Sequence, residues 1–281
     1  MRLKGRYGYE LRKAFGNPCF VISLGVALAI SIWHAFESVS YALWADSVDH
    51  FYVSNQSCFA NWIVVDCNVR VSSTIFFYVV PFLAALPFVW SFLSERMSGY
   101  ASQLVTKETR SDWVKAKGVA TFLTGFTVVA VPLLVNFVCV ACFLPAYTPQ
   151  VEESMTVGLV GNDLFSELFY RLPLMYVVAF IVLDGLLAGA WAVFVLSLSV
   201  IFKNRVSLIV IPYLALLLWQ YVTKTAFTAL GIVGCSLSMI DDMKGVYYSQ
   251  PPDLFVIGVR LLLLLTASAL LLCLQKRKEF I

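Results

Sequence analysis

The chain has 281 residues, of which 60% are hydrophobic and 13% are charged, and its mean hydropathy is +0.83. This composition leaves too little polar surface to solvate a globular body, so it excludes a water-soluble fold. The formal net charge of +3 is small and does not indicate affinity for nucleic acid. We therefore expect one all-α membrane domain that covers residues 1–281.

The first 17 residues have an amphipathic pattern that favours a helix lying in the membrane interface. Its apolar positions recur every four residues, at Leu3, Tyr7, Leu11 and Phe15. Gly16, Asn17 and Pro18 follow and should end this helix, because proline lacks a donor and restricts the residue before it. Gly5 and Gly8 weaken the helix, so a frayed basic tail is the alternative.

Six continuous apolar runs follow, each long enough to cross about 30 Å of hydrocarbon as a helix. They lack the period-two alternation of a membrane β-barrel, which excludes that class. The predicted spans are Cys19 to Phe36, Ile75 to Leu93, Gly118 to Leu144, Leu174 to Phe202, Val206 to Val222 and Leu254 to Leu274.

The basic residues predict the orientation of these spans, because loops rich in Lys and Arg stay in the cytoplasm. Of the 20 basic residues, 15 fall before span one, between spans two and three, between spans four and five, or after span six. We therefore expect a multi-pass protein of the cell membrane with both termini in the cytoplasm and the loop of residues 37–73 outside.

The stretch between spans five and six, residues 223–253, is moderately apolar and contains Gly231 and Gly234. A seventh crossing there would place the basic C-terminus outside, against the charge rule. We therefore predict re-entrant or interfacial helices packed on the outer side.

Two of the seven cysteines, Cys58 and Cys67, share one predicted outer loop and are candidates for a disulfide. The chain has no phosphate loop, no H-E-x-x-H motif, no G-x-S-x-G motif and only two histidines. We therefore expect neither an enzyme nor a metal or cofactor bound by this chain.

One acidic residue, Asp184, lies in the middle of a predicted span, where a charge costs several kcal/mol unless it is shielded. It is a candidate for a substrate path, and a protonated packing residue is the equal alternative. Asn136, four residues after Pro132, is a second candidate for the path, although a structural hydrogen bond to a neighbouring helix suits it better. Gly185 and Gly189 form a G-x-x-x-G pattern that indicates close helix packing.

The predicted cytoplasmic loop of residues 94–118 contains a short amphipathic helix between two spans, which suits docking of a soluble partner. With Glu95-Arg96-Met97-Ser98-Gly99-Tyr100, Thr106-Lys107-Glu108-Thr109-Arg110 and Lys117 leading into the third span, the chain resembles the permease subunit of an ATP-binding-cassette exporter of the type-2 family.

The resemblance implies a permease that pairs with a second permease copy or a homologous permease and with two ATP-binding subunits in the lipid membrane. ATP and Mg would bind those partner subunits, and the loop would couple their hydrolysis to export. The residues that this resemblance assigns to coupling are Glu95, Arg96, Gly99, Tyr100, Leu104, Lys107 and Arg110.

Two other classes of function stay open. A secondary transporter or channel would need several buried polar groups or an inverted repeat. A scaffold or immunity protein without transport would fit the sparse polarity of the spans.

Overall fold

The computed structural model describes residues 2–48, 54–66, 68, 70–97, 110–202, 204–230, 236–247 and 251–278. In these ranges the chain is all-α, without strands, and six stretches are long and apolar enough to cross a membrane, as predicted. The spanning helices are α2 (Pro18–Val48), α3 (Val71–Ala85) followed by α4 (Val89–Met97), α6 (Arg110–Phe143), α9 (Pro173–Ser197), α10 (Arg205–Leu230) and α12 (Leu254–Lys278).

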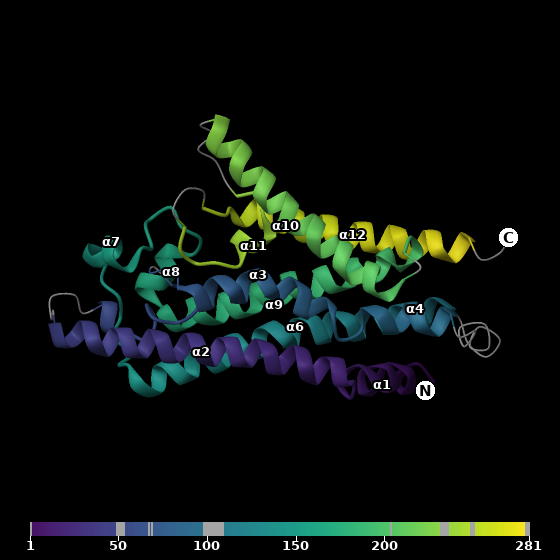
Figure 1. Cartoon of the computed structure of the whole chain (residues 1–281), viewed down its shortest axis with the longest axis horizontal. Coiled ribbons are helices and arrows are strands. Elements are labelled where there is room, and N and C mark those ends of the chain that lie inside the picture. The colour runs from purple at the N-terminus through teal and green to yellow at the C-terminus, as the bar shows by residue number, and fades with distance from the viewer. Residues whose placement is uncertain are drawn as a thin grey trace.

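The helices form an elongated bundle in which both ends of the chain lie at the same end (Figure 1). We call this the terminal end, where α1 (Arg2–Phe15), the end of α4 and the end of α12 are found. The opposite, loop end holds the short helices α7 (Ser154–Val157) and α8 (Ser166–Arg171). An even number of spans is consistent with both termini on one side of the membrane, and the assignment of that side to the cytoplasm stays a prediction from the charges.

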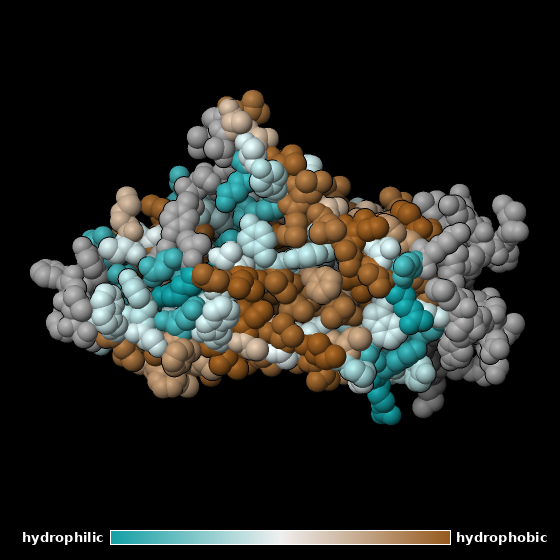
Figure 2. Space-filling view, in the orientation of Figure 1, coloured by the Kyte–Doolittle hydropathy of each residue, from teal (hydrophilic) through white to brown (hydrophobic). Residues whose placement is uncertain are grey.

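Apolar side chains cover the middle of the molecule between polar residues toward either end (Figure 2). The exposed apolar residues of α12 include Phe255, which is 76% exposed, and Leu270, which is 66% exposed. Only 11% of the α12 span is buried, so this helix presents most of its surface outward. A hydrocarbon environment suits such a surface, since in water an apolar patch of this extent is unfavourable.

The joint between α1 and α2 forms where the sequence predicts it. The Asn17 side chain caps α2, because its Oδ1 accepts from the Cys19 amide at 3.1 Å and Pro18 occupies the first helical position. The apolar stripe of α1 does not face outward along its whole length. Ala14 is fully buried and packs with Leu11 against Phe88 and Ala120, so part of the stripe contacts this chain's own helices.

The second span is broken into two helices near Pro87. The residues between α3 and α4 form turns, because proline cannot supply the amide that continues a helix. The Asn17 amide donates from Nδ2 to the Pro87 carbonyl at 2.8 Å. One side chain therefore joins the α1–α2 joint to the break between α3 and α4.

The close contact between α6 and α9 depends on glycine. A Cβ added to Gly189 would lie 2.9 Å from the Phe122 carbonyl oxygen, and one added to Gly185 would lie 2.6 Å from the Phe126 ring. On α6, a Cβ at Gly125 would lie 2.9 Å from Ala192. The G-x-x-x-G pattern therefore serves helix packing within the chain, as predicted.

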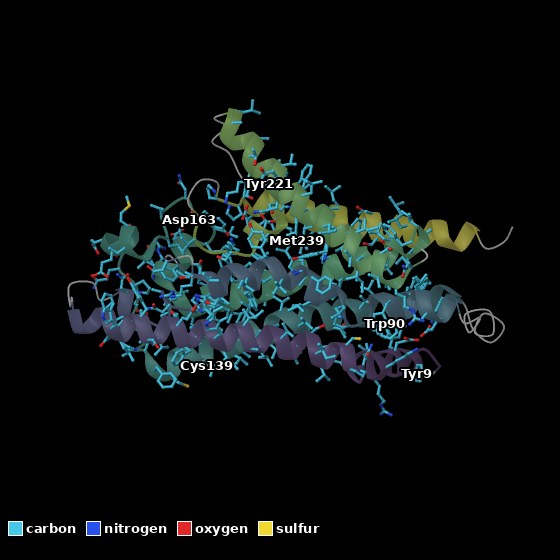
Figure 3. All side chains as sticks on the ribbon, viewed as in Figure 1. Tyr9, Trp90, Cys139, Asp163, Tyr221 and Met239 are labelled. Carbon is cyan, nitrogen blue, oxygen red and sulfur yellow. The ribbon has the colours of Figure 1, made fainter. Side chains whose placement is uncertain are left out.

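The segment between the fifth and sixth spans is described only in part, so the predicted pair of re-entrant helices stays a prediction. Helix α10 continues through residues 223–230, and in the rest of the segment the described residues contain one short helix, α11 (Met239–Asp242). The physical reason is local: residues 213–230 contain neither Gly nor Pro, so nothing ends α10 before Gly231. Met239 of α11 lies in the angle between α10 and the bundle, on the inner side of Tyr221 (Figure 3).

Candidate functional site

Four charged side chains of α1, α4 and α6 meet at the terminal end. We call Glu10, Lys13, Glu95 and Lys117 the ion cluster. The Lys117 Nζ lies 2.9 Å from Glu95 Oε2 and 3.7 Å from Glu10 Oε2, and Lys13 forms a hydrogen-bonded ion pair with Glu95 Oε1. Two ammonium groups and two carboxylates therefore balance in charge.

Lys117 has an unusual environment for a lysine, because its side chain is fully buried. Its Nζ also donates to Ser91 Oγ at 3.2 Å and lies 5.0 Å and 5.6 Å from the ring centroids of Phe88 and Trp113. Carboxylates and aromatic faces thus replace the water that an ammonium ion loses on burial.

Lys13 lies at the exposed edge of the ion cluster. Partial burial by itself lowers the pKa of Lys13, but the hydrogen bond and charge of Glu95 outweigh burial and raise the pKa overall. The charged form is therefore the one that the folded chain stabilises.

The predicted coupling residues fall in two groups. Glu95 belongs to the ion cluster. Arg96 is the second-last residue of α4 and Arg110 is the first residue of α6, so they stand at the two ends of the loop. Gly99, Tyr100, Leu104 and Lys107 lie outside the described residues. Coupling through this loop stays a prediction, while the structure shows that Glu95 contacts Lys13 and Lys117 of its own chain.

Asn136 lies near the loop end, and its amide is engaged within the chain. Its Nδ2 donates to the Ser31 carbonyl at 2.8 Å and lies 3.2 Å from His34 Nδ1, while its Oδ1 accepts from the Ile63 amide at 2.8 Å. Asn136 is fully buried, so it joins α6, α2 and the loop of residues 54–66. These contacts are the structural role that the sequence favours for it.

Asp66 extends this polar network to α3. It accepts from the Arg70 backbone amide at 2.7 Å, from Arg70 Nη1 at 2.6 Å and from Ser73 Oγ at 2.5 Å, and His34 Nε2 lies 3.7 Å from it. Burial alone raises the pKa of Asp66, but the His34 ring, Ser73 and Arg70 outweigh it and lower the pKa to about 2.

The loop end is closed by chain segments that bind one another. The Cys58 amide donates to the Pro145 carbonyl at 2.9 Å, and the Gly245 amide donates to the Val64 carbonyl at 2.9 Å. Cys58 itself is buried, and burial raises the pKa of its thiol to about 11. Cys67 lies outside the described residues, so the Cys58–Cys67 disulfide stays a prediction.

The segment of residues 236–247, which we call the cap segment, is attached to two spans. Gln220 of α10 donates from Nε2 to Asp241 Oδ1 at 2.9 Å, and Arg260 of α12 forms an ion pair with the fully buried Asp242. Lys244 Nζ lies 5.6 Å from the Tyr78 ring centroid, and burial lowers its pKa. The cap segment therefore joins α3, α10 and α12.

Asp184 is fully buried in α9, and neither of its carboxyl oxygens has a hydrogen-bond partner in the described part of the chain. The hydroxyls of Tyr176 and Tyr247 are also buried without a partner there. Burial raises the pKa of Tyr247 well above its ordinary value.

Sequence reasoning missed the partners of the buried charges. Arg260 lies inside an apolar run, which signals that a buried acid must accompany it, and Asp242 is close in sequence to that span. Glu10 is the other omission, because the amphipathic pattern of α1 places it among solvated residues. Across the described residues, no three His, Cys, Asp or Glu side chains are placed to share a metal ion.

Comparisons with known proteins identify no family for this chain: no family model, curated protein or solved structure matches it. The described structure by itself therefore establishes a multi-pass helical membrane protein.

Proposed function

We propose that this chain is the membrane-spanning permease subunit of an ATP-driven exporter, in which separate ATP-binding subunits dock at the terminal end. The observation that carries the proposal is the ion cluster. It joins α1 to α4 and α6, the two helices that flank the predicted coupling loop.

A docked ATPase must move the spans to do transport work, so its contact has to be connected firmly to the bundle. The loop between α4 and α6 emerges beside Glu95, and Glu95 is bound to Lys117 on the other side of the loop. Displacement of the loop would therefore move both helices and, through Glu10 and Lys13, the N-terminal helix as one unit.

The break at Pro87 supports the same reading. It separates α4, which carries Glu95, from α3, which reaches the loop end. Such a break allows the terminal-end unit to turn relative to the rest of the second span. Two copies of the chain, or this chain and a homologous permease, would pair in the membrane, and ATP and Mg would bind the ATP-binding subunits.

The experiment is co-purification of the tagged chain from its native membranes in a mild detergent. We expect an ATP-binding subunit, recognised by its phosphate-loop peptide in mass spectrometry, to accompany the wild-type chain. The double substitution Tyr100→Ala/Leu104→Ala should reduce its recovery at least tenfold, because an apolar helix face that docks in a groove carries much of the binding energy.

The matched control removes two exposed apolar side chains at the opposite end. Val151 and Met155 are 63% and 83% exposed at the loop end, and Val151→Ala/Met155→Ala should leave recovery unchanged. A wild-type chain that purifies without any ATP-binding subunit would overturn the proposal and favour a secondary transporter, channel or scaffold. Equal recovery with both double variants would show that docking lies outside the loop.

A further inference from the structure

One line of buried side chains runs along α9 from the loop end toward the middle of the membrane. Tyr176, Phe180 and Asp184 are spaced by four residues, so they share one face of the helix, and each is fully buried. Eight residues of helix correspond to about 12 Å, which places Asp184 that far from Tyr176 along the helix axis.

The polar atoms along this line are costly to bury. Three side chains of this region contribute buried oxygens that have no hydrogen-bond partner among the described residues: Tyr176 and Tyr247 through their hydroxyls, and Asp184 through both carboxyl oxygens. A buried hydroxyl without a hydrogen-bond partner destabilises the fold, and an unpaired buried carboxylate destabilises it far more. Asp184 is therefore expected to be neutral in this conformation. Side chains chosen for packing alone would not bring these costs.

The cap segment closes the line at the loop end. A Cβ at Gly245 would overlap the Tyr176 hydroxyl, so the backbone of the cap segment passes directly over that hydroxyl. Tyr247 follows two residues later, and its hydroxyl is buried. The cap is held by the hydrogen bond from the Gly245 amide to Val64, by Gln220 and by the Arg260–Asp242 ion pair. A molecule that reached the Tyr176 hydroxyl from this end would have to displace the backbone at Gly245.

Aromatic rings line the same region. The Tyr176 ring centroid lies 4.7 Å from that of Phe180, 5.0 Å from that of Phe169 and 6.5 Å from that of Trp62. Aromatic faces attract cations, and clusters of them bind organic ammonium groups. Among the described residues, Asp184 has no cationic partner, so a bound cation would find both aromatic faces and a carboxyl group that can become its counter-ion.

We propose that Asp184, Tyr176 and Tyr247 form a binding site for a lipophilic organic cation. The cation would occupy the aromatic region after the cap segment moves, and Asp184 would release its proton to become the counter-ion. Charge in the site is then conserved, since one proton leaves for each cation that enters. Asp163 and Asp241 are the other titratable groups whose charges act on Tyr247. A lipophilic organic cation would be the substrate class of the exporter proposed above, and its export rests on that proposed function.

The test measures binding to the isolated chain in detergent, without an ATPase, so its result is independent of co-purification. The probe is tetraphenylphosphonium, and tetraphenylborate is the control ion of the same shape and opposite charge. We expect the wild-type chain to bind the cation and not the anion, with about one proton released per cation bound at neutral pH. Asp184→Asn should weaken cation binding at least tenfold and abolish the proton release, and Tyr247→Phe should weaken binding about threefold.

Glu167→Gln serves as the matched control, because Glu167 is an exposed acid paired with Arg171 at the loop end. It should bind the cation as the wild type does. Tyr247→Phe also guards against a folding defect in Asp184→Asn, since it keeps the aromatic packing intact. Three outcomes would each overturn the proposal, whatever the result of co-purification. The wild type could bind both ions equally, or it could fail to bind the cation. The Asp184→Asn variant could also bind the cation as well as the wild type does and still release a proton.

Discussion

Replacement of Lys117 by methionine tests the ion cluster most directly. Methionine fills the buried volume but removes one of the two ammonium groups, so that Glu10 and Glu95 then share the charge of Lys13. Loss of one partner from a buried ion pair costs about 3–5 kcal/mol. Because Lys13 is 39% exposed and still pairs with Glu95, we expect the lower end of that range, about 3 kcal/mol.

The assay is equilibrium unfolding of the purified chain in mixtures of mild detergent and SDS. Lys117→Met/Glu95→Gln restores the charge balance of the cluster, so it should recover more than half of the lost free energy of unfolding. Glu167→Gln breaks an exposed ion pair and should change that free energy by less than about 0.5 kcal/mol. If Lys117→Met unfolds within about 0.5 kcal/mol of the wild type, the cluster does not hold α1, α4 and α6 together.

Three further predictions concern packing, pH and orientation. Gly189→Ala should destabilise the chain by about 1–3 kcal/mol, because the added Cβ would press on a backbone carbonyl of α6. Its control is Gly258→Ala in α12, where the space around the glycine is open. This variant should be neutral or slightly stabilising in the same unfolding assay. The lowered pKa of Asp66 contributes about 2 kcal/mol that is present above pH 4 and lost as the pH falls toward 2; Asp66→Asn should remove this part of the pH dependence, and an unchanged profile would contradict it. A cysteine at Met155, which is 83% exposed, should react with an impermeant maleimide in intact cells. A cysteine at Tyr9, which is 57% exposed, should react only after the cells are permeabilised. Both are measured against the wild-type chain, and the reverse pattern would invert the predicted topology.

The spans could be predicted because their cause is local in sequence. A bilayer requires a continuous apolar run of fixed length, and each of the six runs meets that requirement without help from its neighbours. The start of α2 at Pro18 is equally local, since Asn17 supplies the cap and proline the first helical residue. The end of α10 is harder to predict. The moderate polarity after residue 222 suggests that the helix stops there, but residues 213–230 contain neither Gly nor Pro to end it.

Partnerships between distant residues could not be predicted in the same way. Lys117 and Glu10 are far apart in sequence, and nothing in either local pattern names the other. Asn136 reads as a polar residue in a span, and only the packing of α2 and the loop beside it shows where its three contacts go.

The sequence by itself determined an all-helical chain with six spans, a separate N-terminal helix and a strong bias of basic residues, because length, hydropathy and proline act on each segment alone. The tertiary structure decided which charges are neutralised and which are left without partners. Glu95, which is predicted to take part in coupling, is paired with Lys13 and Lys117, whereas Asp184 is buried without a partner among the described residues. The physical reason is that the cost of a buried charge depends on what lies within a few ångströms of it, and that is set by how the helices pack.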